Sequence, residues 1–175
     1  MNKKIIIVTL LIAVLSFGSI YANTTQEKAA KDLNEIQVLK GDGKNLNLDG
    51  ELTRAEGATF IVRLLGKEDD AMSMANSNSI FTDVPSWAKG YVNYAKAKGL
   101  TNGVTSTEFG SSDPMSAEMY VTFLLRSLGY DDTKGDFNWK ESLTKAESIN
   151  MITSTTTYTS TTFIRSHIAK LSYDA

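Results

Sequence analysis

Apolar residues recur at helical spacing along the chain, and glycines close the segments that carry them. The clearest segment begins at Thr53 and ends at Gly66. Its apolar stripe consists of Phe60, Ile61, Leu64 and Leu65. Thr53 and Glu56 have the spacing of a capping box, in which the hydroxyl and the carboxylate each accept a hydrogen bond from a backbone N–H of the first turn. The pattern therefore predicts an amphipathic helix that Thr53 opens and Gly66 stops.

Four other segments show similar helical signals. They are residues 23–40 before Gly41, residues 86–98 after Pro85, residues 116–128 before Gly129, and a last segment that begins near Phe163. In the first of these, the positions expected to face the core are Ala29, Leu33, Ile36 and Leu39. The polar residues 67–79 are expected to form a linker. Residues 153–162 are almost all Ser and Thr, and the pattern leaves a loop and a short extended piece equally open.

The predicted elements repeat along the chain. Val62-Arg63-Leu64-Leu65-Gly66 returns as Leu125-Arg126-Ser127-Leu128-Gly129, and Phe137 and Trp139 stand where Phe81 and Trp87 begin the preceding unit. Each unit is a helix, a turn-rich loop and a capped helix, which has too few apolar residues to form a core alone. We therefore expect the units to pack against each other and to bury their apolar stripes together.

The N-terminal segment has the pattern of a secretory signal peptide. Lys3 and Lys4 precede an apolar run over residues 5–17, and small residues follow up to Ala22. This is the order of an n-region, an h-region and a cleavage site. A retained membrane anchor is the alternative, but the run is shorter than the roughly 20 residues of a spanning helix. We expect cleavage after residue 22, no later membrane-spanning segment, and a mature protein outside the cytoplasmic membrane.

Composition excludes several kinds of function. A formal net charge of −2 does not favour general nucleic-acid binding. The absence of cysteine and the single histidine, His167, exclude disulfides, thiolate sites and His-rich metal sites. We find no nucleophile elbow, zinc-protease motif, P-loop or dinucleotide fingerprint. We therefore expect no enzyme and no cofactor, although paired carboxylates for sugar hydrolysis need not be close in the chain.

Two groups of motifs resemble the S-layer homology repeat. Phe81-Thr82-Asp83-Val84 followed by Trp87-Ala88 is similar to its opening half, and Leu52-Thr53-Arg54-Ala55-Glu56 is similar to its closing half. The resemblance divides the chain into a signal peptide, repeat one, a linker, repeat two and a diverged repeat three: residues 1–22, 23–66, 67–80, 81–130 and 131–175. It implies a mainly α fold of three helical repeats in a pseudo-threefold arrangement, with grooves between neighbouring repeats.

The resemblance also implies a ligand and a location. Proteins of this family bind anionic, often pyruvylated, secondary wall polysaccharides attached to peptidoglycan, at the surface of the cell. In that picture the Arg of the Thr-Arg-Ala-Glu signature meets a carboxylate of the ligand. By position this Arg is Arg54 in repeat one and Arg165 in repeat three, whereas repeat two has Ala117. The candidate glycan-binding residues are Arg54, Glu56, Trp87, Arg165 and His167.

Structural roles compete with these assignments. Capping alone accounts for Thr53 and Glu56, whereas it does not require Arg54, which lies beside free backbone N–H groups that also attract a carboxylate. Trp87 is expected to pack in the core or between repeats more readily than to stack on a sugar, and a polar surface residue is the default for His167. Arg63 and Arg126 lie late in their helices, where a cation is stabilised by the helix dipole, so they are interpreted as structural.

Calcium binding is the alternative function. Residues 45–56 fit the twelve-residue EF-hand loop, with oxygen side chains at its first, third and fifth positions, Gly50 at the sixth and Glu at the twelfth. The candidate ligands are Asn45, Asn47, Asp49 and Glu56. Asn at the first position removes a charge from the strongest ligand site, and one loop accounts for none of the repetition.

Overall fold

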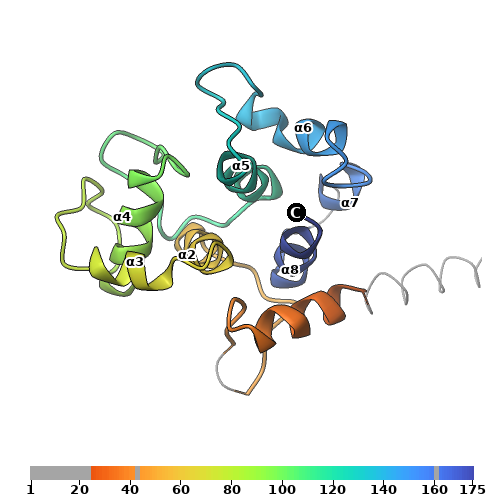
Figure 1. Cartoon of the computed structure of the whole chain (residues 1–175), viewed down its shortest axis with the longest axis horizontal. Coiled ribbons are helices and arrows are strands. Elements are labelled where there is room, and N and C mark those ends of the chain that lie inside the picture. Colours follow the sequence, from red (N-terminus) through yellow and green to blue (C-terminus); the bar gives the residue numbers. More distant parts are fainter. Residues whose placement is uncertain (1–24, 42–43, 160–161) are drawn as a thin grey trace, which may run out of the picture.

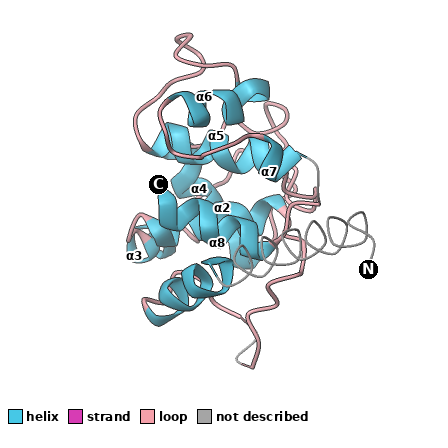
Figure 2. Ribbon diagram, turned by 90° about the vertical axis from the view of Figure 1, so that its right-hand side faces the viewer, coloured by secondary structure: helices cyan, strands magenta, loops and turns pink. Residues whose placement is uncertain are grey.

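The computed structural model describes residues 25–41, 44–159 and 162–175, so the predicted signal peptide lies outside the described residues. The described chain consists of helices and loops (Figure 2), and its extended backbone is limited to two isolated antiparallel bridges, Glu51 with Ile164 and Thr53 with Pro114. The predicted mainly α fold is confirmed. Within these ranges no helix combines the length and apolar character needed to span a membrane.

In the part of the chain that the structure describes, a helix over residues 25–35 is followed by nine further helical elements. They are α2 (Arg54–Leu64), α3 (Glu68–Ser73), η1 (Ser86–Ala88), α4 (Lys89–Ala97), α5 (Ala117–Ser127), η2 (Trp139–Glu141), α6 (Ser142–Ser148), α7 (Thr156–Thr159) and α8 (Arg165–Asp174). Two predictions need correction. The segment expected to be a linker contains α3, which packs against α4, and the Ser/Thr-rich segment contains the short helix α7.

The three repeats form a closed ring. The inner helices α2, α5 and α8 lie together at its centre, and the helix of residues 25–35, α4 and α6 lie around them (Figure 1). The outer helix of one repeat packs on the inner helix of the repeat before it, α4 on α2 and α6 on α5. The helix of residues 25–35 closes the ring beside α8, where Lys28 Nζ lies 3.5 Å from the hydroxyl of Tyr173.

The central helices begin with the caps that the sequence predicts. Thr53 Oγ1 accepts a hydrogen bond from Glu56 N at 3.3 Å, and Thr53 N donates to the Glu56 carboxylate at 2.7 Å, so the capping box is confirmed. Ser116 caps α5 in the same way, accepting from Met119 N at 3.2 Å. Gly66 and Gly129 follow the helix ends at φ of 65° and 95°, where a side chain is disfavoured.

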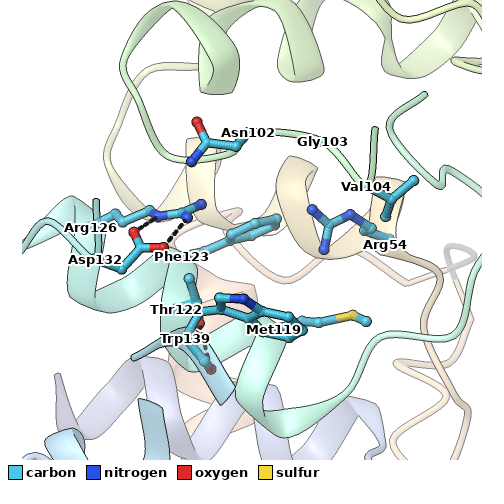
Figure 3. A pocket seen from close by; sticks show the side chains of 10 residues that line it. All are labelled: Arg54, Asn102, Gly103, Val104, Met119, Thr122, Phe123, Arg126, Asp132 and Trp139. Carbon is cyan, nitrogen blue, oxygen red and sulfur yellow. Dashed lines mark hydrogen bonds and ion pairs between the residues drawn. The ribbon is translucent and has the colours of Figure 1, made fainter. Parts of the chain in front are cut away.

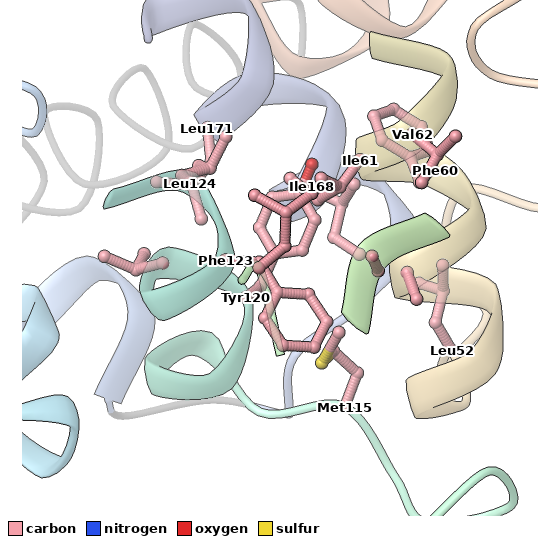
Figure 4. Close-up of a cluster of buried hydrophobic side chains, with 14 of the residues drawn as sticks. Leu52, Phe60, Ile61, Val62, Met115, Tyr120, Phe123, Leu124, Ile168 and Leu171 are labelled. Atoms are coloured by element: carbon pink, nitrogen blue, oxygen red, sulfur yellow. The ribbon is translucent and has the colours of Figure 1, made fainter. Parts of the chain in front are cut away.

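The core lies where the inner helices meet (Figure 4). Its largest completely buried side chains include Ile61, Tyr120, Phe123, Leu124, Ile168 and Leu171. Of the apolar positions that the sequence predicts to face the core in the first two helices, five are buried and two are exposed. The buried ones are Ala29, Leu33, Leu39, Phe60 and Ile61. Ile36 is 67 % exposed because the helix ends at residue 35, and Leu65 is 38 % exposed at the C-cap of α2.

Backbone hydrogen bonds join the start of an inner helix to the loop of the next repeat. The N–H groups of Arg54 and Ala55 donate to Asp113 and Ser111 at 2.9 and 3.2 Å. At α8, Arg165 N and Ser166 N donate to Gly50 and Leu48 at 2.9 and 3.0 Å. Because the first N–H groups of a helix have no partner inside it, these bonds satisfy them and fix the rotation of one repeat against the next.

Asp83 holds the loop of repeat two in place. Its carboxylate accepts hydrogen bonds of 2.7 to 2.8 Å from three successive backbone N–H groups, those of Phe109, Gly110 and Ser111. Desolvation raises the pKa of Asp83, but the three N–H donors outweigh it and the pKa lies below its ordinary value. The same loop presents the Phe109 and Ser111 carbonyls to repeat one, so Asp83 orders the contact between the two repeats.

Replacing Asp83 by Ala is expected to lower the free energy of unfolding by about 1–3 kcal/mol, because three N–H groups lose a charged acceptor and only partly regain water. The measurement is denaturant unfolding followed by far-UV circular dichroism. Glu108→Gln is the matched control, since Glu108 lies in the same loop and its side chain is exposed. Equal stability of the Asp83→Ala variant and the control would contradict the role given to Asp83.

Candidate functional site

In the described part of the chain, two grooves between neighbouring repeats contain a signature arginine. The first, named here the Trp139 groove, has a volume of about 430 Å³. It is lined by Arg54, Asn102, Gly103, Val104, Met119, Thr122, Phe123, Arg126, Asp132 and Trp139. The second, the Trp87 groove, has a volume of about 300 Å³ and is lined by Val38, Leu39, Lys40, Leu52, Glu56, Thr59, Phe60, Arg63, Trp87 and Arg165. Both volumes are in the range of small-molecule sites, about 300–1,000 Å³.

The two grooves are built from equivalent parts. One wall is an inner helix, α5 in the Trp139 groove and α2 in the Trp87 groove, and each helix supplies Thr, Phe and Arg at the same spacing. These residues are Thr122, Phe123 and Arg126 on α5 and Thr59, Phe60 and Arg63 on α2. The signature arginine of the preceding repeat and the tryptophan that opens the following repeat complete each groove. The repetition in the sequence therefore produces two copies of one site.

Arg54 is held in a fixed position inside the Trp139 groove. Only 6 % of the residue is exposed, its Nε donates to the Phe109 carbonyl at 2.8 Å, and its Nη2 donates to Thr101 Oγ1 at 3.2 Å. The guanidinium carbon lies 4.9 and 5.1 Å from the ring centres of Phe109 and Phe123, which is cation–π distance. Arg54 thus stabilises the contact between repeats and also lines the groove.

The guanidinium of Arg54 has no anionic partner in the described part of the chain, since its hydrogen bonds go to a carbonyl and a hydroxyl. Burial lowers its pKa to about 10, and the nearby charge of Arg126 acts in the same direction. The carboxylates of Asp113 and Asp83 offset part of this effect. A buried cation beside a second cation favours an anion from outside the protein.

Arg126 faces Arg54 across the groove, with Phe123 between them and Trp139 beside them (Figure 3). Its Nε and Nη2 each donate to an oxygen of Asp132 at 2.8 Å, and its Nη1 donates to the Leu100 carbonyl at 3.1 Å. One sequence interpretation is therefore incomplete, because Arg126 and Arg63 are not only charges at helix ends and each lines a groove. Asp132, one of two adjacent aspartates in a loop, forms a nearly buried ion pair with Arg126.

The Trp87 groove repeats the arginine contacts. Arg165 Nε donates to the Leu46 carbonyl at 2.9 Å and Nη2 donates to the Lys40 carbonyl at 2.8 Å. Arg63 and Lys40 both contact the Glu68 carboxylate, at 2.9 and 3.1 Å. Glu68 also accepts from the Tyr91 hydroxyl, and this bond, together with the two cations, lowers the pKa of Glu68 to about 2.

One expectation about the signature arginines is wrong. The sequence places free N–H groups of the first helical turn beside Arg54, ready for a ligand carboxylate. In the structure, the N–H groups of Arg54 and Ala55 donate to repeat two, and those of Arg165 and Ser166 donate to repeat one. These backbone groups are already satisfied, so recognition of an anion in the grooves falls to side chains.

Both tryptophans of the chain are groove residues. Trp87 is 51 % exposed and Trp139 is 44 % exposed, so neither side chain lies in the core. Of the two packing positions expected for Trp87, in the core or between repeats, the structure excludes the core and places Trp87 at a groove between repeats. The 3₁₀ helices η1 and η2 carry them at the groove rims. Sequence reasoning missed Trp139 as a site residue, although its position at the start of a diverged repeat is the signal that identifies it.

Of the other two predicted site residues, Glu56 lies in a groove and His167 does not. Glu56 lines the Trp87 groove while it caps α2. His167 does not line either groove, and its Nδ1 accepts a hydrogen bond from Ile164 N at 3.3 Å, which gives it the capping role of Glu56 in repeat three. Ala117 occupies the position of the signature arginine in repeat two and lines a third pocket. Among the described residues, the lining of this pocket includes Glu51 and Glu118 and no cation.

Acidification is expected to destabilise the fold through His167, the one histidine of the chain. Burial lowers its pKa, and its Nδ1 accepts a hydrogen bond only while the ring is neutral there. The unfolded chain then binds more protons than the native state, so stability falls as pH decreases below about 6.5. Urea unfolding between pH 7.5 and 5, compared with His167→Gln, measures this. An unchanged pH slope in the variant would contradict it.

The proposed calcium loop is not favoured by the geometry. The Glu56 carboxylate, which would be its bidentate ligand at the twelfth position, accepts hydrogen bonds from Thr53 N and Thr53 Oγ1 at the start of α2. Across residues 25–41, 44–159 and 162–175, no group of three or more acidic or histidine side chains is arranged to hold a metal ion.

Comparison with known proteins agrees with this architecture. Residues 80–116 match the family model of the S-layer homology domain. The chain is 30 % identical over 143 residues to a cell surface protein of Thermoanaerobacter kivui and 32 % identical over 161 residues to the middle cell wall protein of Brevibacillus brevis. It is also 34 % identical over 112 residues to a surface layer protein of Brevibacillus choshinensis.

The matches cover 80 %, 85 % and 62 % of this chain but only 18 %, 15 % and 10 % of the three relatives, respectively. The chain therefore spans less than a fifth of the length of these proteins. It carries an S-layer homology domain, and the matches support a secreted location at the cell surface.

Proposed function

We propose that the chain anchors to the bacterial cell wall without a covalent bond, by binding an anionic, pyruvylated secondary wall polysaccharide in the Trp139 groove. The observation that carries this proposal is the buried guanidinium of Arg54, which lines an open groove and has uncharged hydrogen-bond partners. The S-layer homology domain and the names of the relatives support a role at the wall.

The groove offers each part of a pyruvylated sugar a partner. The ketal carboxylate pairs with Arg54, whose Nη1 is turned to neither Phe109 nor Thr101. The ketal methyl group and the sugar ring pack on Met119 and the exposed face of Trp139. A hydrogen bond to a charged group is worth about 1.5–3 kcal/mol. One groove thus gives modest affinity, which a polymer that repeats its acidic unit increases through effective concentration.

Co-sedimentation with purified wall sacculi tests this function. The chain from residue 23 is mixed with intact sacculi and with sacculi stripped of secondary polymer by mild acid. We expect binding to intact sacculi only, and at least about tenfold weaker binding for Trp139→Ala. Ile80→Ala is the matched control, because Ile80 is an exposed apolar residue that lines neither groove.

Thermal unfolding of both variants is the control that distinguishes a loss of binding from a loss of the folded structure. The proposed function would be overturned if the folded chain did not bind intact sacculi, or if it bound stripped sacculi equally well.

A further inference from the structure

The two grooves differ at one position of their shared helix wall. Glu56 on α2 and Met119 on α5 are both the third residue of their helix, and both line their groove. The three other wall residues of each helix are Thr, Phe and Arg in both grooves. One groove therefore has a carboxylate beside its signature arginine where the other has a thioether.

This exchange changes the charge that a ligand meets. In the Trp87 groove, Glu56 stabilises the charged form of Arg165, which lies in the same groove. The other two cations, Lys40 and Arg63, share the carboxylate of Glu68. In the Trp139 groove Arg126 is paired with Asp132, whereas Arg54 forms no ion pair within the described residues. The charge of Arg126 affects the pKa of Arg54 more than the carboxylates of Asp113 and Asp83 do.

We propose that the two grooves bind different units of one polymer: the Trp139 groove takes an acidic sugar, and the Trp87 groove takes an uncharged sugar, with Glu56 and Met119 setting the difference. This inference rests on the proposed function for the first groove and goes beyond it for the second. An acidic unit that approaches Arg165 also approaches Glu56, and the repulsion between the two carboxylates opposes binding.

The Trp87 groove has the partners that an uncharged sugar needs. Trp87 is half exposed and lines the groove, and the apolar side of a pyranose can stack on an exposed indole ring. Glu56 supplies carboxylate oxygens, which accept strong hydrogen bonds from hydroxyl groups. Arg165 lines the same groove, and its Nη1 is not used in the hydrogen bonds to Leu46 and Lys40. Its smaller volume, about 300 Å³ against about 430 Å³, fits a unit without a ketal.

The chain has two tryptophans, one in each groove, so fluorescence reports each groove separately. Trp87→Phe leaves Trp139 as the reporter of its own groove, and Trp139→Phe leaves Trp87. Each variant is titrated with two glycosides that differ only in the acid: methyl glucoside and its 4,6-O-pyruvylated form. We expect the titration followed by Trp139 to give a dissociation constant at least about tenfold lower for the pyruvylated form than for the unmodified form. The titration followed by Trp87 is expected to show the opposite preference.

Two variants change the charge at position 56 or 119 and keep the N-terminal cap of the helix, so they test the role of this position in ligand choice. Met119→Glu completes a capping box with Ser116, which already accepts from Met119 N, and Glu56→Gln keeps a side-chain acceptor for Thr53 N. In the Trp87→Phe background, Met119→Glu is expected to remove the preference for the pyruvylated glycoside. In the Trp139→Phe background, Glu56→Gln is expected to let the pyruvylated glycoside bind the Trp87 groove.

The inference is overturned if Trp87 responds to the pyruvylated glycoside as well as Trp139 does, if neither glycoside changes Trp87 fluorescence, or if Glu56→Gln leaves the Trp87 preference unchanged. Failure of the proposed function looks different. In that case Trp139 does not respond to the pyruvylated glycoside and the chain does not sediment with intact sacculi, whatever Trp87 reports.

Discussion

Replacing Arg54 by Ala is expected to lower the free energy of unfolding by about 2–4 kcal/mol and to abolish binding of the acidic polymer. The stability effect follows because the Phe109 carbonyl and the Thr101 hydroxyl lose their buried donor and a cavity opens between two phenylalanine rings. The binding effect follows because the acidic unit loses its cation. Urea unfolding and sedimentation with sacculi, both at a temperature where the variant is folded, measure the two effects.

Arg165→Ala is the matched control for Arg54→Ala, because Arg165 makes equivalent hydrogen bonds to two carbonyls at the other interface. It is expected to cost a similar amount of stability while the response of Trp139 to the pyruvylated glycoside remains. If Arg54→Ala and Arg165→Ala reduced that response equally, loss of fold rather than loss of an anion contact would be the cause, and the assignment of Arg54 would be wrong.

Removing residues 163–175 is expected to abolish cooperative folding of the whole chain rather than to leave two folded repeats. The deletion removes α8, whose Ile168 and Leu171 are completely buried, and Arg165, which binds the loop of repeat one. The apolar faces of α5 and of the helix over residues 25–35 are then open to water, and repeats of this size do not have a sufficient core alone. Circular dichroism and limited proteolysis measure the outcome.

Removal of Asp174 and Ala175 alone is the control for this deletion, since both residues are exposed at the end of α8. The trimmed chain is expected to unfold in one cooperative transition close to that of the complete chain. A deletion variant lacking residues 163–175 that still unfolded cooperatively would show that repeats one and two form an independent unit, contrary to the ring.

Local signals in the sequence predict much of this fold. The Thr53–Glu56 capping box, the glycine stops and the buried apolar stripes depend on residues within one helix, so spacing alone reveals them. The short helix α3 was missed because it has one buried residue, Ala71, and depends on packing against α4 rather than on its own periodicity.

The site is harder to predict from the sequence than the helices are, because its residues come from three different repeats. Arg54, Arg126 and Trp139 are far apart in the chain and meet only after the ring has formed. The chemistry of Arg54 is recognisable from its motif, but its hydrogen bonds to the loop of the next repeat are not. The second role of Arg126, as part of the groove wall, is visible only in the fold, and two adjacent aspartates in the sequence do not reveal that Asp132 pairs with it.

The closed ring has a topological consequence. Because Lys28 near the start of the described chain touches Tyr173 near its end, the contacts do not depend on which repeat is translated first. A circular permutant, with a flexible peptide joining the two ends and a new opening in the exposed turn at residues 133–135, should reach the same native packing.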